Sequence, residues 1–199
     1  MVRVYKSFGE LSEREREGQD YRIDTCFRDK RVLVMAPHGG QIEPGTTEIA
    51  EAIARDDFSF YSFEGIKLRG NGVLHIESHL FDEPRALEMV EKTDSVVSVH
   101  GQADTIDEFV MVGGLNTDFR SEIERELGRS GFRTLEPSGG LMAIDPRNIC
   151  NRGRSGKGVQ LEISRRLRDS LRIDEDLLRK FADAVRRGVR LYLEQVDPS

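Results

Sequence analysis

The 199-residue chain has no tryptophan, only two cysteines and no apolar run that approaches the length of a membrane span. A helix that crosses a bilayer needs about 20 largely apolar residues, so we expect no membrane partner. Cys26 and Cys150 are too few for a disulfide framework, and two reduced thiols are favoured over the single bridge that they could form. The stretch that starts at Met1 lacks the apolar core of a secretory signal. We therefore expect a soluble, cytoplasmic protein, whose release by lysis would be compatible with the sequence.

Positive net charge is also missing, since the formal charge at pH 7 is −6. Domains that bind nucleic acid are normally basic, so no nucleic-acid partner is expected. The 37% hydrophobic and 33% charged residues are typical of a globular protein with a heavily solvated surface. The length fits one domain. We predict a single domain over residues 1–199, in which residues 1–20 form a surface segment.

Short apolar runs alternate with helical patterns along the chain. Strands are predicted at 31–36, 57–68, 73–76, 95–99, 109–112, 131–135 and 159–163, with an edge strand or loop at 20–30. The 57–68 strand alternates apolar and polar residues and is expected near an exposed face. Helices are predicted within 7–18, over 46–55, from 84, over 117–129 and over 174–195, while 137–158 is a long ordered loop. This alternation predicts an α/β fold with a mixed, largely parallel sheet flanked by helices.

The stretch 32–54, VLVMAPHGGQIEPGTTEIAEAIA, joins a buried strand to a helix through a loop that carries His38 and Glu43. Pro37 is expected to end the strand, because its nitrogen cannot donate to a sheet. Two later strands run into His100 and Glu162, and open α/β sheets carry their chemistry at such strand ends. A hydrolytic zinc takes three His or Glu ligands and a water. His38, Glu43 and His100 are therefore candidate ligands of one zinc ion per chain, and Glu162 is the candidate base. A structural role for each histidine stays open on spacing alone.

Several blocks resemble, in sequence and in order, the poly-γ-glutamate hydrolase family of bacterial and phage proteins. These blocks are APHGGQIEPGTTEIAEAIA, SFYSFEG, LHIESHLFDEP, SVVSVHG and NICNRGRSGKGVQLEISRRLR, within about residues 18–190. The resemblance implies a zinc-carboxypeptidase-like α/β core that hydrolyses γ-glutamyl amide bonds with one zinc. It implies ligands at His38, Glu43 and His100, and a catalytic carboxylate at Glu162. Gln41 replaces a glycine of many relatives, which should change loop flexibility more than chemistry.

Four residues are candidates for binding substrate. Asn151 and Arg152 resemble the Asn-Arg pair with which zinc carboxypeptidases hold a carboxylate, and a guanidinium can grip a carboxylate with two hydrogen bonds. A solvated loop cation is an equal interpretation of Arg152. Arg165 belongs to a basic run between Asp145 and Arg172 that could attract a polyanion, although ordinary surface charge explains it about as well. His79 could line the cleft, but a structural role is favoured.

The primary hypothesis is a zinc-dependent amidohydrolase that cleaves γ-glutamyl amide bonds of poly-γ-glutamate or of a related acidic acyl-amide. The expected partner is therefore an anionic γ-glutamyl polymer or a small acidic amide substrate. One alternative keeps the zinc and changes the substrate to a small N-acyl amino acid. An alternative from another class is a non-catalytic polyanion-binding module that uses the basic residues of 147–172. That module would bind no zinc and would be weakened by salt. The oligomeric state and the choice between endo and exo cleavage stay open.

Overall fold

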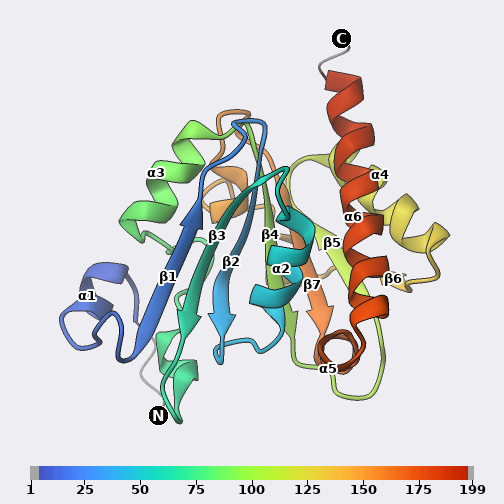
Figure 1. Cartoon of the computed structure of the whole chain (residues 1–199). Coiled ribbons are helices and arrows are strands. Elements are labelled where there is room, and N and C mark those ends of the chain that lie inside the picture. Colours follow the sequence, from blue (N-terminus) through green and yellow to red (C-terminus); the bar gives the residue numbers. More distant parts are fainter. Residues whose placement is uncertain (1–4, 197–199) are drawn as a thin grey trace.

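Residues 5–196 are described by the computed structural model, and their strands form one seven-stranded mixed sheet (Figure 1). The strands are β1 (Tyr21–Cys26), β2 (Val32–Gly40), β3 (Ser59–Gly65), β4 (Ser95–Gln102), β5 (Val110–Gly113), β6 (Thr134–Leu135) and β7 (Val159–Ser164). Their order is β1-β3-β2-β4-β7-β5-β6. All neighbours are parallel except the β1–β3 and β5–β7 pairs. The predicted mixed, largely parallel sheet is confirmed.

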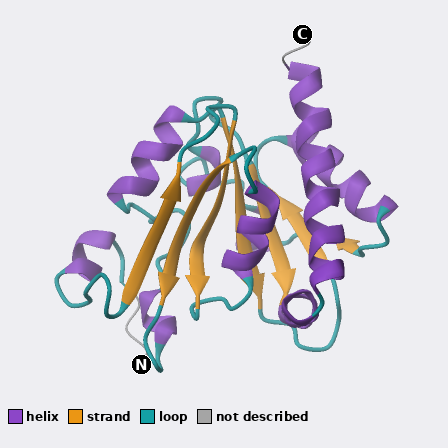
Figure 2. Ribbon diagram, viewed as in Figure 1, coloured by secondary structure: helices purple, strands orange, loops and turns teal. Residues whose placement is uncertain are grey.

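Helices cover both faces of this sheet (Figure 2). The α-helices are α1 (Phe8–Ser12), α2 (Thr46–Ala54), α3 (Pro84–Lys92), α4 (Thr117–Arg129), α5 (Arg165–Ile173) and α6 (Glu175–Val196), and the 3₁₀ helices are η1 (Asn71–Leu74), η2 (Gly139–Met142) and η3 (Ile149–Asn151). One core cluster joins the sheet to α2, α4, α5 and α6. The other joins it to α1, α3 and the segments around η1 and η3. Of the predicted surface segment 1–20, residues 1–4 lie outside the described part and the rest includes α1, whose Leu11 is buried.

The first five residues of the inner strand β2, residues 32–36, are all apolar because both faces of the strand are covered. Val32 and Val34 pack in the cluster with α2 and α6, whereas Leu33 and Met35 pack on the opposite side. This is the two-residue alternation of a strand. Burial of each such side chain contributes about 1.5–3 kcal/mol to folding. The sheet is thereby fixed between two layers, and the carboxyl ends of its parallel strands meet at one edge.

Pro37 does not end β2, contrary to the prediction. Pairing with β4 does stop at Met35, but pairing with β3 resumes at Gly39 after an irregularity. At Pro37, which has no N–H to donate, the ladder to β4 has ended, whereas the ladder to β3 is irregular but continues. This break releases the segment around His38 from the ladder to β4 and lets its side chain reach other elements.

Two further strand predictions were wrong. Residues 71–74 form η1 instead of a strand, because the Asn71 side chain bonds both the N–H and the carbonyl of Lys67 and folds the chain into a turn. The strand β3 is buried along its whole length, between β1 and β2, and not near an exposed face. Two polar side chains of this strand bond each other, since Ser62 Oγ donates a hydrogen bond to the Glu64 carboxylate.

Other features of the chain agree with the sequence. The 137–158 segment is ordered and contains no strand, although η2 and η3 lie within it. Asp174 caps α6, since its Oδ1 accepts from the N–H of Leu177 at 2.9 Å. Cys26 and Cys150 are both free thiols, the second of them buried. No helix within residues 5–196 is both long enough and apolar enough to cross a membrane.

Candidate metal centre and active site

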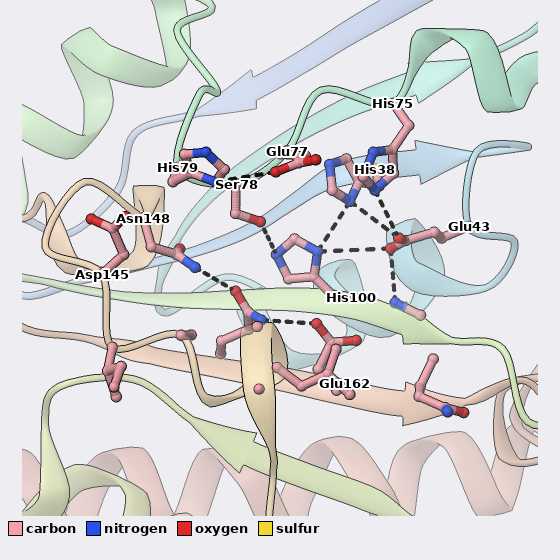
Figure 3. A pocket seen from close by; sticks show the side chains of 18 of the residues that line it. His38, Glu43, His75, Glu77, Ser78, His79, His100, Asp145, Asn148 and Glu162 are labelled. Carbon is pink, nitrogen blue, oxygen red and sulfur yellow. Dashed lines mark hydrogen bonds and ion pairs between the residues drawn. The ribbon is translucent and has the colours of Figure 1, made fainter. Parts of the chain in front are cut away.

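The parallel strands β2, β4 and β7 bring the predicted site residues to one edge of the sheet (Figure 3). His38 lies near the end of β2, Glu43 in the loop between β2 and α2, His100 near the end of β4, and Glu162 on β7 beside His100. All four line one open pocket of about 650 Å³. The strand-end pattern thus brings together residues that are up to 124 positions apart in the chain.

Glu43 lies at the centre of a cluster of imidazoles. Its Oε1 is 3.2 Å from His38 Nδ1, and its Oε2 is 3.8 Å from His100 Nδ1. The two histidines approach each other directly, with 3.1 Å between their Nδ1 atoms. Each pair of these three side chains therefore has potential ligand atoms within 3.8 Å of each other.

Backbone and hydroxyl groups hold these side chains from outside. His38 Nε2 lies 2.7 Å from the carbonyl oxygen of Ile76. Because a carbonyl can only accept, Nε2 carries a proton, so a neutral His38 ring would have its lone pair on Nδ1, the atom that faces the cluster. His100 Nε2 lies 3.4 Å from Ser78 Oγ, and the N–H of Gly101 donates to Glu43 Oε2 at 2.8 Å. Outer partners of this kind fix the rings of metal-binding histidines.

Burial and mutual charge shift the pKa of the four predicted site residues. Burial opposes the charge on His38, but the Glu43 carboxylate outweighs it and raises the pKa of His38. Burial alone would raise the pKa of Glu43, yet the nearby histidines hold it well below its usual value. Burial and then His38 lower the pKa of His100 to about 3. Burial and then Glu43 raise the pKa of Glu162 to about 8. The Glu43 carboxylate and the two imidazoles beside it form a donor set whose negative charge a divalent cation would balance.

His75, which the sequence placed only in a predicted strand, joins this cluster. Its Nε2 is 3.5 Å from Glu43 Oε1, and its ring lies against that of His38 with 3.8 Å between centroids. Ligand atoms of His38, Glu43 and His75 all lie within 4.8 Å of one another. His75 follows η1 and not a strand, so the strand-end pattern could not identify it. Two alternative ligand sets thus share His38 and Glu43.

The four predicted substrate-binding residues are dispersed. His79 lines the pocket, where its Nδ1 lies 3.3 Å from Glu77 Oε2. Asn151, Arg152 and Arg165 are not among the described residues that line it. The Asn151 amide is bonded to four backbone groups of the surrounding loops. Arg152 reaches the carbonyl of Phe81, and Arg165 pairs with Asp169 at 2.8 Å.

Most of the basic run from Arg147 to Arg172 is paired with acidic side chains. Arg147 pairs with Asp145, and Arg154 lies 3.5 Å from Asp94. Arg172 lies 3.8 Å from Glu48 on α2. Charges that are neutralised in this way produce a weaker field than the sequence count of basic residues suggests.

Comparison with known proteins identifies relatives over most of the chain. The family model described as poly-γ-glutamate hydrolase matches residues 5–185. UPF0714 protein YndL of Bacillus subtilis (strain 168) is 39% identical over 173 residues, a match that covers 84% of this chain and 66% of YndL. The chain therefore spans slightly less than two thirds of that relative.

Two solved structures are similar over nearly their whole length. A bacteriophage poly-γ-glutamate hydrolase has a TM-score of 0.92 and 33% identity, and the match covers 97% of this chain and 99% of that one. A zinc-free, apo form of YndL has a TM-score of 0.85 and 34% identity, with 94% and 98% covered.

Proposed function

Because the chain belongs to the poly-γ-glutamate hydrolase family, we propose that it is a zinc-dependent amidohydrolase that cleaves γ-glutamyl amide bonds of poly-γ-glutamate. The observation that carries this proposal is the cluster of His38, Glu43 and His100, whose side chains approach one another pairwise to 3.1–3.8 Å, beside the buried carboxyl of Glu162. A zinc-free form of the relative YndL is consistent with zinc as the metal.

The donor set fits zinc. Imidazole nitrogens and one carboxylate are the ligands of hydrolytic zinc sites, which use three protein ligands. The partly exposed Glu43 carboxylate and His38 Nδ1, which lies 3.2 Å from it, supply a site that a cation would stabilise. A bound zinc would supply Lewis-acid chemistry, because it lowers the pKa of water from about 16 towards about 7 and polarises a carbonyl oxygen.

Glu162 is the residue that we assign to proton transfer. Its carboxyl is buried, lies in the pocket, and has a pKa raised towards neutrality. A group of this kind can take a proton from the attacking water and return it to the leaving amine. Both steps of amide hydrolysis then use one side chain.

We propose His100, and not His75, as the third ligand. His100 is buried on β4 and its outer nitrogen is held by Ser78. The His75 side chain is 35% exposed at the pocket and is better suited to contact substrate. The zinc content of purified His100→Ala and His75→Ala proteins tests this choice. Loss of zinc in the first and retention in the second are expected, and the opposite pattern would replace His100 by His75.

An acidic substrate needs positive charge near this pocket. Among its described lining residues there is no lysine or arginine, while Glu77 and Asp145 lie at its rim. Bound zinc and the imidazole of His79 would then be the local partners of a substrate carboxylate. Arg152 and Arg165 would act from outside the lining, by long-range attraction of the polymer. Asn151 would support substrate binding indirectly, because its side-chain amide fixes the backbone of the surrounding loops.

The test is hydrolysis of poly-γ-glutamate by the zinc-loaded protein, followed by release of amino groups and by product length. Glu162→Gln should lower kcat by about 10²–10⁴-fold, the usual contribution of a general base, with zinc content unchanged. Glu91→Gln, the same change at an exposed residue of α3 outside the pocket, is the matched control. An active, zinc-loaded Glu162→Gln protein would contradict the assignment. Equal rates of hydrolysis on short and long poly-γ-glutamate would favour the alternative in which the substrate is a small N-acyl amino acid.

A further inference from the structure

A chain of buried side-chain amides ends on the Glu162 carboxyl group. Gln160 and Glu162 are two residues apart on β7, so their side chains point to the same face of the sheet. Gln160 Nε2 donates to Glu162 Oε1 at 2.8 Å, and Asn148 Nδ2 donates to Gln160 Oε1 at 3.0 Å. Both amides line the pocket and are buried. The dashed lines between Asn148 and Glu162 in Figure 3 mark this chain.

The direction of the chain is set by the backbone. The N–H of Cys150 lies 3.1 Å from Asn148 Oδ1, and an N–H can only donate. Asn148 must therefore present its oxygen to Cys150 and its NH₂ group to Gln160. Gln160 must then accept with its oxygen, so its own NH₂ group faces Glu162. The donor at Glu162 is fixed by the loop around η3 and does not depend on the protonation of Glu162.

This arrangement leaves one oxygen of Glu162 available. Oε1 is engaged by Gln160, whereas Oε2 makes no hydrogen bond to any residue in the described part of the chain. The carboxyl is thus held at one oxygen and free at the other, on the side of the pocket. A base that transfers protons needs this combination of fixed orientation and one open oxygen.

We propose that Gln160 and Asn148 are positioning residues for proton transfer by Glu162. The inference rests on the proposed hydrolase function. Gln160 fixes the rotamer of Glu162 through Oε1, and Asn148 prevents the Gln160 amide from turning its oxygen towards the carboxylate. Neither residue contacts the groups that we assign to zinc. Their loss should lower kcat without changing zinc content.

Two substitutions test whether Gln160 and Asn148 position Glu162 or only provide hydrogen-bond partners for buried polar groups. Gln160→Met keeps the length of the side chain and removes the donor. In Asn148→Asp the new carboxylate still accepts from Cys150 but cannot donate to Gln160. The Gln160 amide should then reverse, donate to this new carboxylate and present its oxygen to Glu162. Gln41→Met, the same change at an exposed loop residue outside the pocket, is the matched control.

The kinetic experiment measures kcat, KM and zinc content on poly-γ-glutamate for each variant. Gln160→Met and Asn148→Asp should each lower kcat about 10–100-fold, the usual effect of residues that support a catalytic group, with KM and zinc within about twofold of wild type. Gln41→Met should match wild type. A kcat within about twofold of wild type in folded, zinc-loaded Gln160→Met would overturn the inference.

A second readout does not use activity. In ¹⁵N-labelled, zinc-free protein, the side-chain NH₂ resonances of Gln160 are assigned by their loss in Gln160→Met. They should shift when Glu162→Gln replaces the carboxyl acceptor by an amide, and shift again in Asn148→Asp. Resonances that stay unchanged in both variants would contradict the hydrogen bonds from Asn148 to Gln160 and from Gln160 to Glu162. If the wild-type protein does not hydrolyse the polymer, the proposed function fails, and these spectra still decide whether the amide chain holds Glu162.

Discussion

Gly101→Ala should destabilise the protein through collision with one side chain, that of Arg168. A methyl group built on Gly101 would lie 2.4 Å from the Cζ of Arg168, and 2.6 and 2.8 Å from its two terminal nitrogens. Gly101 lies in β4 and does not have a positive φ, so the backbone itself would accept alanine. The cost therefore depends on whether the guanidinium can move.

The guanidinium of Arg168 has little freedom to move. It is 3% exposed and donates to the carbonyls of Ile163 at 3.1 Å, Gln102 at 3.2 Å and Pro44. Displacement by about 1 Å would break at least one of these bonds, and a hydrogen bond to a charged group contributes about 1.5–3 kcal/mol. Overpacking adds about 1–3 kcal/mol. We expect Gly101→Ala to lower the free energy of unfolding by about 3 kcal/mol.

A double-mutant cycle tests this cause. In an Arg168→Ala background the same Gly101→Ala change should cost about 0.5 kcal/mol or less, which gives a coupling energy of about 2–3 kcal/mol. Unfolding by urea is followed by far-UV circular dichroism, because the chain has no tryptophan. An excess of chelator is needed, since bound metal would change apparent stability by mass action.

The control is Gly128→Ala in α4, where an added methyl meets no atom within 4 Å. It should stabilise the protein by up to about 1 kcal/mol, because glycine is a poor helix former. Additive costs for Gly101→Ala and Arg168→Ala, within about 0.5 kcal/mol, would refute the collision. A neutral Gly101→Ala would refute the whole argument.

Two further predictions concern thiols and acid stability. A thiol reagent should modify Cys26 in the native protein and reach Cys150 only in denaturant, because Cys150 is buried and burial raises the pKa of its thiol; two reactive thiols in the native protein would contradict this. Arg190 and Arg186 hold the pKa of Asp57 below its usual value, although burial opposes them. The stability that this carboxylate contributes is present above its unfolded pKa of about 3.9 and is lost as the pH falls through the lower folded pKa. Asp57→Asn should therefore lower the urea midpoint at pH 7 and not at pH 2, and an equal loss at both would count against the ion pairs.

The sequence predicted those parts of the fold in which local pattern and burial agree. The apolar run of β2 and the stripe of α6 were correct, since their faces are covered as their periodicity implies. The prediction for β3 was wrong because Ser62 and Glu64 were interpreted as solvent-facing. Both are buried, and Glu64 accepts from Ser62 and pairs with Arg22 at 2.7 Å. A polar residue whose partner is distant in the chain cannot be distinguished from a solvated one by alternation.

The convergence of the candidate site could be predicted where residues lie at strand ends. His38, Glu43, His100 and Glu162 meet because β2, β4 and β7 are parallel neighbours. His75 could not be found in this way, because it follows a 3₁₀ helix whose position depends on tertiary packing. The roles of these residues in metal binding and proton transfer remain predictions.

Arg168 shows why the residues behind the site escaped prediction. The segment RRLRDSLR was treated as part of a basic run, and α5 was not predicted. Yet Ser164 caps this helix by accepting from the N–H of Leu167, and Leu167 and Leu171 lie on its buried face. Side chains three and four residues apart share a face of a helix, so Arg168 must accompany Leu171 into the interior. Recognition of the cap and the leucine spacing would have separated one buried arginine from its solvated neighbours. Charge counting obscured that periodicity, and with it the side chain that contacts the carbonyl groups next to Glu43 and Glu162.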